Sequence, residues 1–77
     1  MLQRTDKTTI FGGRVVTPGD TVNLAPCSKE EHQFMINWLG EPPYTILWIG
    51  KWGSGSTILY IKTEDPSGTG VHPSYFV

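Results

Sequence analysis

The chain has 77 residues, one cysteine, and six basic and seven acidic side chains that leave a net charge of −1. This length fits a single domain, and one cysteine excludes an intrachain disulfide. No cysteine–histidine cluster and no phosphate-cradling glycine motif is present, so we expect neither a metal ion nor a cofactor, and the lack of a basic run disfavours a nucleic-acid partner.

The chain has no apolar run long enough to cross a bilayer, and Met1 is not followed by a charged and then apolar leader. Together with a free Cys27, which we expect to be buried or inert, these observations predict a cytoplasmic protein without a membrane partner. A compact chain with no accessory segments is also similar to products of phages and mobile elements.

Residues 1–9 are polar and lack periodicity, which predicts a flexible N-terminal arm or the approach to an edge strand. Residues 10–77 are predicted to form a single domain. Within it, the Thr-Pro-Gly-Asp run at residues 17–20 predicts a turn, because proline presets one backbone dihedral and glycine accepts a positive one. Val22 and Leu24 then alternate with polar residues, which predicts a strand with one buried face.

The middle of the chain carries helix signals. Ser28 and Glu31 have the spacing of a capping box, and Gly40 marks a helical stop. These signals predict a short helix from Lys29 to about Leu39, although alternating apolar residues at 32–38 leave a strand as the alternative. The large apolar residues of this helix lie on or beside one stripe: Phe34, Met35, Trp38 and Leu39.

The two runs at residues 44–52 and 56–62 are rich in β-branched and aromatic side chains and predict a β-hairpin. Between them lies Gly-Ser-Gly at residues 53–55. A three-residue loop with glycine at its last position suits a type I turn followed by a left-handed residue.

The register of this turn decides which side chains share a face of the hairpin. It predicts Trp48 opposite Tyr60, and Leu47 opposite Ile61. We expect the aliphatic face in the core: Leu47, Ile49, Leu59 and Ile61. The other face carries Tyr44, Ile46, Trp48, Trp52 and Tyr60. Because a small sheet needs only one apolar face, this second face is predicted to contact either a partner or its own chain.

The end of the chain suggests a fold. Residues 64–70 have the composition of a loop, and Pro73 confines any further pairing to a sheet edge. The strand after Pro-Gly-Asp, the tryptophan-bearing hairpin and the ending His-Pro-Ser-Tyr-Phe-Val at residues 72–77 together resemble an SH3-like barrel, since SH3 domains end in Pro-Ser-x-Tyr-Val. The resemblance implies a mainly β fold, a small barrel of five to six antiparallel strands with one short helix or helical turn.

The same resemblance implies an aromatic groove for proline-rich peptides, formed here by Trp48 or Trp52 with Pro73 and Tyr75. The first-strand Ala-Leu-Tyr-Asp-Tyr pattern of SH3 domains is replaced by Thr-Val-Asn-Leu-Ala at residues 21–25. Half of that groove therefore has no counterpart.

A second group with a similar fold is the plasmid-borne, trimethoprim-resistant dihydrofolate reductases, which share a Gly-Asp-x-Val strand with residues 19–22. Their catalytic Val-Gln-Ile-Tyr strand is replaced here by Gly-Val-His-Pro at residues 70–73. This chain lacks the residues that carry their chemistry, and we exclude that enzyme.

These observations predict a non-enzymatic binding module whose partner is a protein or peptide, including a second copy of itself. The predicted contact residues are Tyr44, Trp48, Trp52, Tyr60, His72, Pro73 and Tyr75. One alternative is a small barrel that stacks single-stranded nucleic acid on its rings. Another is an enzyme whose site forms at a symmetric oligomer interface, where copies of His72 or Tyr75 converge.

Overall fold

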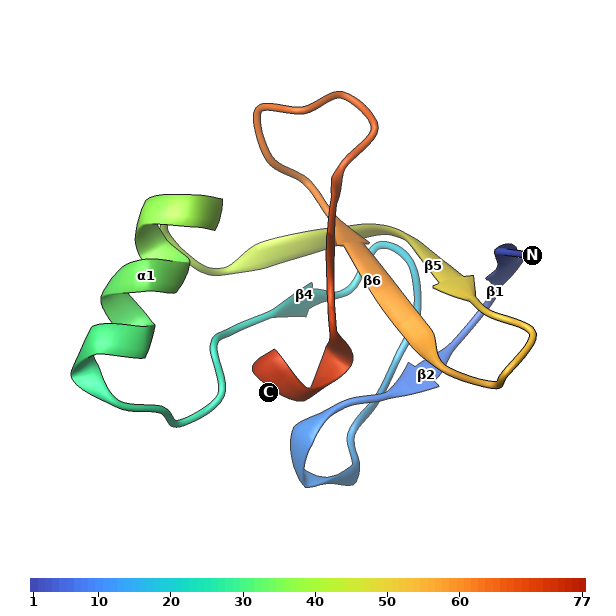
Figure 1. Cartoon of the computed structure of the whole chain (residues 1–77), viewed down its shortest axis with the longest axis horizontal. Helices are drawn as coiled ribbons and strands as arrows, with labels where there is room; N and C mark the ends of the chain where they lie inside the picture. Colours follow the sequence, from blue (N-terminus) through green and yellow to red (C-terminus); the bar gives the residue numbers. More distant parts are fainter.

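The long strand β5 (Tyr44–Lys51) is the centre of the fold in this computed structural model, which describes residues 1–77. Strand β6 (Thr57–Ile61) pairs with one edge of β5, while β1 (Gln3–Thr5) and β4 (Thr21–Val22) pair with the other. All of these pairings are antiparallel, and β5 and β6 cross the middle of the molecule (Figure 1).

The remaining elements are short. Strand β7 (Thr69–Val71) extends the sheet beside β6, and β2 (Thr8–Thr9) pairs with β3 (Val15–Val16) in a separate hairpin. Two 3₁₀ turns, η1 (Phe11–Gly13) and η2 (Pro73–Tyr75), and one α-helix complete the chain. The prediction of a mainly β, antiparallel fold with one short helix is confirmed; the strands number seven, and their pairing does not close into a ring.

The first nine residues form two short strands, as the edge-strand alternative predicted, and do not form a flexible arm. Strand β1 pairs with the last third of β5, so that Arg4 lies opposite Gly50. Strand β2 adds a side-chain contact to the central sheet, because the hydroxyl oxygens of Thr8 and Thr57 are 2.8 Å apart.

The helix α1 (Lys29–Leu39) lies where the capping signals predict it, and the strand alternative for residues 32–38 is wrong. The Ser28 hydroxyl oxygen accepts a hydrogen bond from the Glu31 backbone N–H at 3.2 Å. Gly40 ends the helix with φ at 87°, a left-handed conformation that favours glycine. Neither α1 nor any other helix has the length and apolarity needed to cross a membrane.

The hairpin turn also follows the prediction. Trp52 donates its backbone N–H to the Ser56 carbonyl at 2.8 Å, and Gly55 takes a left-handed φ of 96° after a turn closed onto Trp52. The three-residue loop is therefore confirmed, and Trp48 lies opposite Tyr60 as expected.

Beyond Trp48 the predicted pairing is wrong, because β5 contains a bulge. Ile61 pairs with Ile46 instead of Leu47, so Leu47 is an extra residue on its strand. The bulge reverses the alternation of side chains from that point. Leu47 is 39 % exposed, whereas Ile46 and Tyr44 face the core.

The core is one cluster that gathers residues from every part of the chain: Ile10, Val16, Val22, Met35, Leu39, Tyr44, Ile46, Ile49, Leu59, Ile61, Val71 and Phe76. At its centre the rings of Tyr44 and Phe76 meet edge to face at 5.9 Å. Two backbone hydrogen bonds between Asn23 and Val77 hold the C-terminal end against the chain that follows β4.

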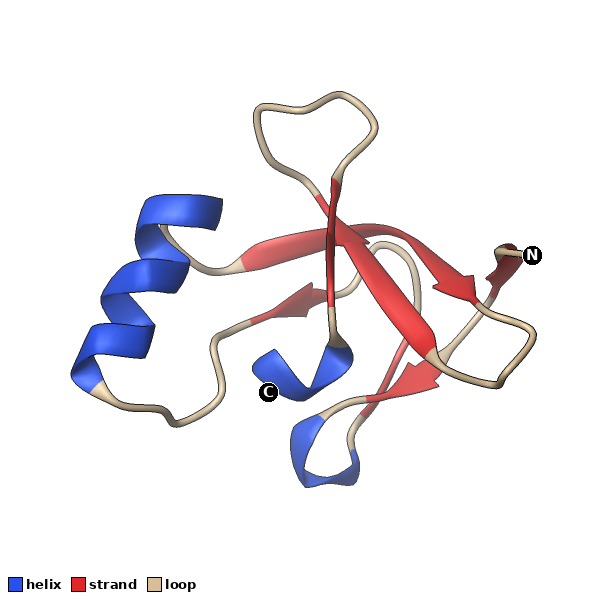
Figure 2. Ribbon diagram, viewed as in Figure 1, coloured by secondary structure: helices blue, strands red, loops and turns tan.

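The helix and the N-terminus lie at opposite ends of the molecule, whose principal extents are 33 × 28 × 20 Å (Figures 1 and 2). The tip of the β5–β6 hairpin lies at the N-terminal end, and the chain's C-terminus returns to the middle, between the helix and the hairpin (Figure 2). This arrangement gives the molecule two surfaces of different chemistry.

Candidate binding surface

The second face of the hairpin is covered largely by its own chain. The rings of Trp48 and Tyr60 stack in parallel, with 3.8 Å between their centroids and 3° between their planes. The Arg4 guanidinium lies 4.9 Å from the Trp48 ring centroid, and the indole N–H donates to the Ser67 carbonyl at 3.4 Å. Both rings are half-buried.

Two glycines allow this stack to lie close to the sheet. Gly70 pairs with Tyr60, and a Cβ atom at Gly70 would lie 3.1 Å from the Tyr60 ring. A Cβ atom at Gly50 would lie 3.2 Å from the Trp48 ring and 2.8 Å from the Leu2 side chain. The two aromatic rings therefore take the space that side chains would occupy at these positions.

Tyr44 does not reach the molecular surface with its ring. Burial raises the pKa of its phenol above the usual value, and the negative charge of Glu41 raises it further. The phenol hydroxyl donates to the Gly40 carbonyl at 2.7 Å, which ties the start of β5 to the end of α1.

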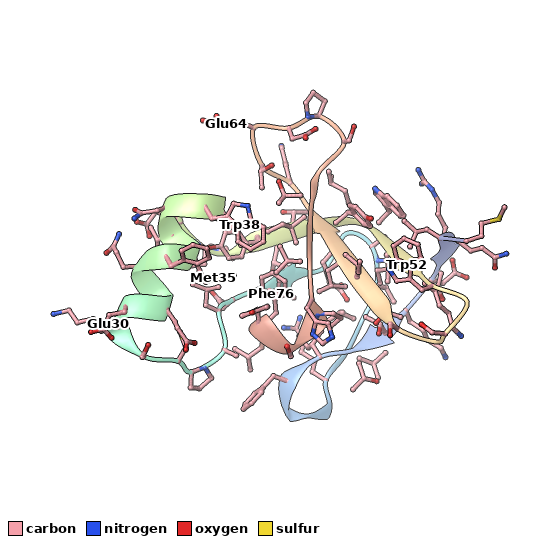
Figure 3. The ribbon with its side chains drawn as sticks, viewed as in Figure 1. Glu30, Met35, Trp38, Trp52, Glu64 and Phe76 are labelled. Carbon is pink, nitrogen blue, oxygen red and sulfur yellow. The ribbon has the colours of Figure 1, made fainter.

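The residues of the expected SH3-type groove are not brought together. Pro73 is buried and His72 caps η2 by accepting the Ser74 backbone N–H at its Nδ1. Trp52 is exposed on the hairpin side of the molecule, and Figure 3 shows it far along the long axis from Trp38 of the helix. Tyr75 lies on the helix side, where it lines a hollow with Trp38.

The helix presents two apolar stripes rather than one. Met35 and Leu39 are buried against the core, and Met35 lies between the helix and Phe76 (Figure 3). Phe34 and Trp38, each one position earlier, form a neighbouring stripe that is 66 % and 47 % exposed. Their ring centroids are 6.2 Å apart and their planes are tilted by 47°, so the rings form one continuous apolar surface.

Tyr75 extends this surface from a distant part of the sequence. A hollow of about 290 Å³ is lined by Glu31, Phe34, Met35, Trp38 and Tyr75. The Tyr75 side chain is 48 % exposed, while its carbonyl accepts the Ala25 backbone N–H at 2.8 Å and the next residue, Phe76, is fully buried. We call Phe34, Trp38 and Tyr75 the aromatic surface.

Carboxylates flank the aromatic surface on two sides. Glu31 is part of the first hollow, and a second hollow of about 410 Å³ places Glu64 and Asp65 beside Trp38. Figure 3 shows Glu64 on the loop after β6, above the helix. No lysine or arginine lines either hollow.

The sequence predicted Tyr75 as a contact residue but not Phe34 or Trp38. The available signal was the number of large apolar side chains on α1, which exceeds what one buried stripe needs. Periodicity alone does not tell which of two adjacent stripes faces the core.

Apart from one contact between a histidine and a serine, the reactive side chains do not form a cluster. His72 Nδ1 lies 2.7 Å from the Ser74 hydroxyl, but this contact spans two residues and belongs to the η2 cap. No group of three or more His, Cys, Asp or Glu side chains is placed to hold a metal ion. Cys27 is exposed, so of the two predicted alternatives, a buried or an inert thiol, the buried one is wrong.

Comparison with known proteins finds no matching family model, and neither the curated proteins nor the solved structures include a significant match.

Proposed function

We propose that this chain is a small, non-enzymatic binding module that recognises a protein partner through the aromatic surface. The observation that supports the proposal is the convergence of Phe34, Trp38 and Tyr75, all about half-exposed or more, around one hollow. The proposal places the module in the cytoplasm, where an exposed thiol such as Cys27 stays reduced.

The chemistry of these residues favours a protein interface. Tryptophan and tyrosine are enriched among interface anchors, because they bury a large rigid area and lose little side-chain entropy. Contiguous exposed apolar patches are uncommon on monomers unless they serve an interaction. On α1 the core already takes Met35 and Leu39, so the fold does not require Phe34 or Trp38 to be apolar.

This proposal moves the contact region from the hairpin face to the helix. Trp48 and Tyr60 stack on one another beneath Arg4, and Tyr44 is buried. Of the residues that the sequence predicted for binding, Tyr75 lies within the proposed surface. Trp52 lies outside it, which makes Trp52 a matched control.

Self-association is a second part of the proposal. A chain of this length gains stability when it buries apolar surface against another copy. The large hydrophobic residues that are exposed include several outside the aromatic surface: Met1, Phe11, Val15, Leu47, Trp52 and Val77. Sedimentation velocity at micromolar concentrations is expected to show a dimer or larger species, and a monomer throughout would contradict this part.

We also infer that the fold is a divergent SH3-like barrel. Support comes from the antiparallel order β1-β5-β6-β7 with β4 joined to β5, from the bulge that bends β5, and from the pairing of Leu24 with Phe76. Amide hydrogen exchange is expected to protect both edges of β5 together, and unprotected β1 and β4 amides would contradict the inference.

The experiment that tests the binding proposal is a selection from a random displayed peptide library against the immobilised protein. Ligands are expected to bind the wild type and Trp52→Ala equally and to lose at least tenfold in affinity for Trp38→Ala, about 1.4 kcal/mol. Ligands that bind Trp38→Ala as tightly as wild type, or a selection that enriches none, would overturn the proposal.

A further inference from the structure

The chemistry around the aromatic surface points to the kind of partner that it accepts. Resting on the proposed function, we infer that the occupant is an arginine-bearing segment of a partner protein, with its cationic side chain in the hollow between Trp38, Tyr75 and Glu31.

The first argument is the composition of that hollow. Phe34, Trp38 and Tyr75 offer aromatic ring surface, and Glu31 is the single charged residue among them. An arginine stem covers apolar surface while its guanidinium stacks on a ring and pairs with a carboxylate. A lysine ammonium is more strongly hydrated and lacks the planar stacking face, so the same site favours arginine.

The first turn of the helix carries two acidic residues. Glu30 and Glu31 precede Phe34 by four and three residues, which places them one turn away on the same side of α1. The Glu31 backbone N–H is bound by the Ser28 cap, so the first helical turn that carries both carboxylates is fixed. Lys29 and Glu30 line neither hollow beside Trp38, so Glu31 is the helix carboxylate that faces the rings.

A second cation can be accommodated on the other side of Trp38. Glu64 and Asp65 line the hollow there together with the end of α1. The Asp65 carboxylate accepts the Ser67 backbone N–H at 2.8 Å, which orders the loop that carries both acids. A segment that crosses Trp38 therefore meets carboxylates at both ends of its path.

Three of the six basic residues of the chain lie together at the other end of the molecule. Lys7 and Lys51 line a hollow of about 400 Å³ beside β1, and Arg4 lies on the same strand pair. This end lies opposite the helix along the long axis (Figure 1). Because no lysine or arginine lines either hollow beside Trp38, a cationic partner is attracted by the carboxylates there without a competing basic side chain.

A second copy of the chain suits this surface less well. In a two-fold symmetric contact the same surface meets itself, so the carboxylates of Glu31, Glu64 and Asp65 would be brought toward the carboxylates of the other copy. Like charges brought together in an interface are destabilising. The proposed self-association is therefore expected to use other exposed apolar residues.

The test uses one short synthetic peptide in three versions, with two arginines, two lysines or two uncharged citrullines beside the same leucines. Affinity for the full chain is measured by tryptophan fluorescence. The arginine peptide is expected to bind about tenfold more tightly than the citrulline peptide, with the lysine peptide between them, and to weaken as salt rises. Glu31→Gln is expected to reduce the arginine preference several-fold, and Trp52→Ala to leave it unchanged; amide NMR spectra confirm that the variants are folded.

Equal affinity of the arginine and citrulline peptides would overturn this inference, as would failure of all three to bind. The peptide library distinguishes that failure from failure of the proposed function. If the library ligands require Trp38 but carry no arginine, the proposed binding function stands and the inference of an arginine-bearing partner is refuted. The inference would also be refuted if the protein without peptide sediments as a dimer and Trp38→Ala sediments as a monomer. The occupant of the aromatic surface would then be a second copy of the chain.

Discussion

The Trp48 and Tyr60 rings lie parallel with 3.8 Å between their centroids, directly across the β5–β6 pair. Trp48 and Tyr60 were both predicted to contact a binding partner, and here they contact each other within one chain. The pair therefore acts in folding, and its energetic coupling is measurable.

We expect Trp48→Ala and Tyr60→Ala each to lower the free energy of unfolding, and the double variant to lose less than the sum of the two. The coupling should be about 1 kcal/mol, because a stacked pair contributes that much beyond the area it buries. Urea unfolding of the wild type and three variants measures it. Strictly additive losses would show that the rings do not interact.

Gly70→Ala is expected to destabilise the fold by about 1–3 kcal/mol, since the new methyl group would press on the Tyr60 and Ile58 side chains, each 3.1 Å away. Gly53→Ala serves as the control. It lies in the hairpin loop with no atom within 4 Å of an added Cβ, and it should change stability by less than about 0.5 kcal/mol. Equal effects at the two positions would contradict the close packing of Tyr60 on Gly70.

The bulge in β5 predicts opposite behaviour for two adjacent residues. Ile46→Ala should cost about 2–5 kcal/mol because the side chain is fully enclosed, whereas Leu47→Ala should cost under about 1 kcal/mol. Thermal or urea unfolding of both variants checks the difference. A larger loss at Leu47 than at Ile46 would mean that the strand pairs without the bulge.

Tyr44 is expected to make the fold sensitive to alkaline pH. Its pKa is raised in the folded state, so its contribution to stability is fully present below the unfolded value of about 10 and is lost as pH rises through the folded value. Tyr44→Phe should cost about 1 kcal/mol at neutral pH, through loss of the hydrogen bond to Gly40, and should lose less stability than wild type above pH of about 10. Parallel alkaline curves for the two proteins would contradict this assignment.

Local signals in the sequence predicted the parts of the fold that depend on local chemistry. The Ser28 cap and the left-handed Gly55 each follow from a few neighbouring residues, and both lie where they were expected. The bulge at Leu47 could not be predicted in this way, because it arises from how β5 pairs with β6. That single inserted residue reversed the expected faces of Tyr44 and Ile46.

The candidate site depends even more on tertiary structure. The sequence placed Phe34 and Trp38 on or beside one stripe with Met35 and Leu39, and a helix of mixed apolar residues does not reveal which part of such a stripe is buried. Their meeting with Tyr75 depends on the backbone contact of Tyr75 with Ala25, which joins segments fifty residues apart. The SH3-type ending predicted that Tyr75 would be exposed, but placed it near the hairpin tryptophans rather than the helix.

Binding of an arginine-bearing partner at the aromatic surface is tested most directly by mapping the bound arginine peptide on the chain with two-dimensional amide NMR. The largest shift changes are expected on helix α1 and on the C-terminal segment around Tyr75, with small changes near Trp48 and Trp52. Changes centred instead on the β5–β6 hairpin would contradict this expectation and return the binding site to the strand face.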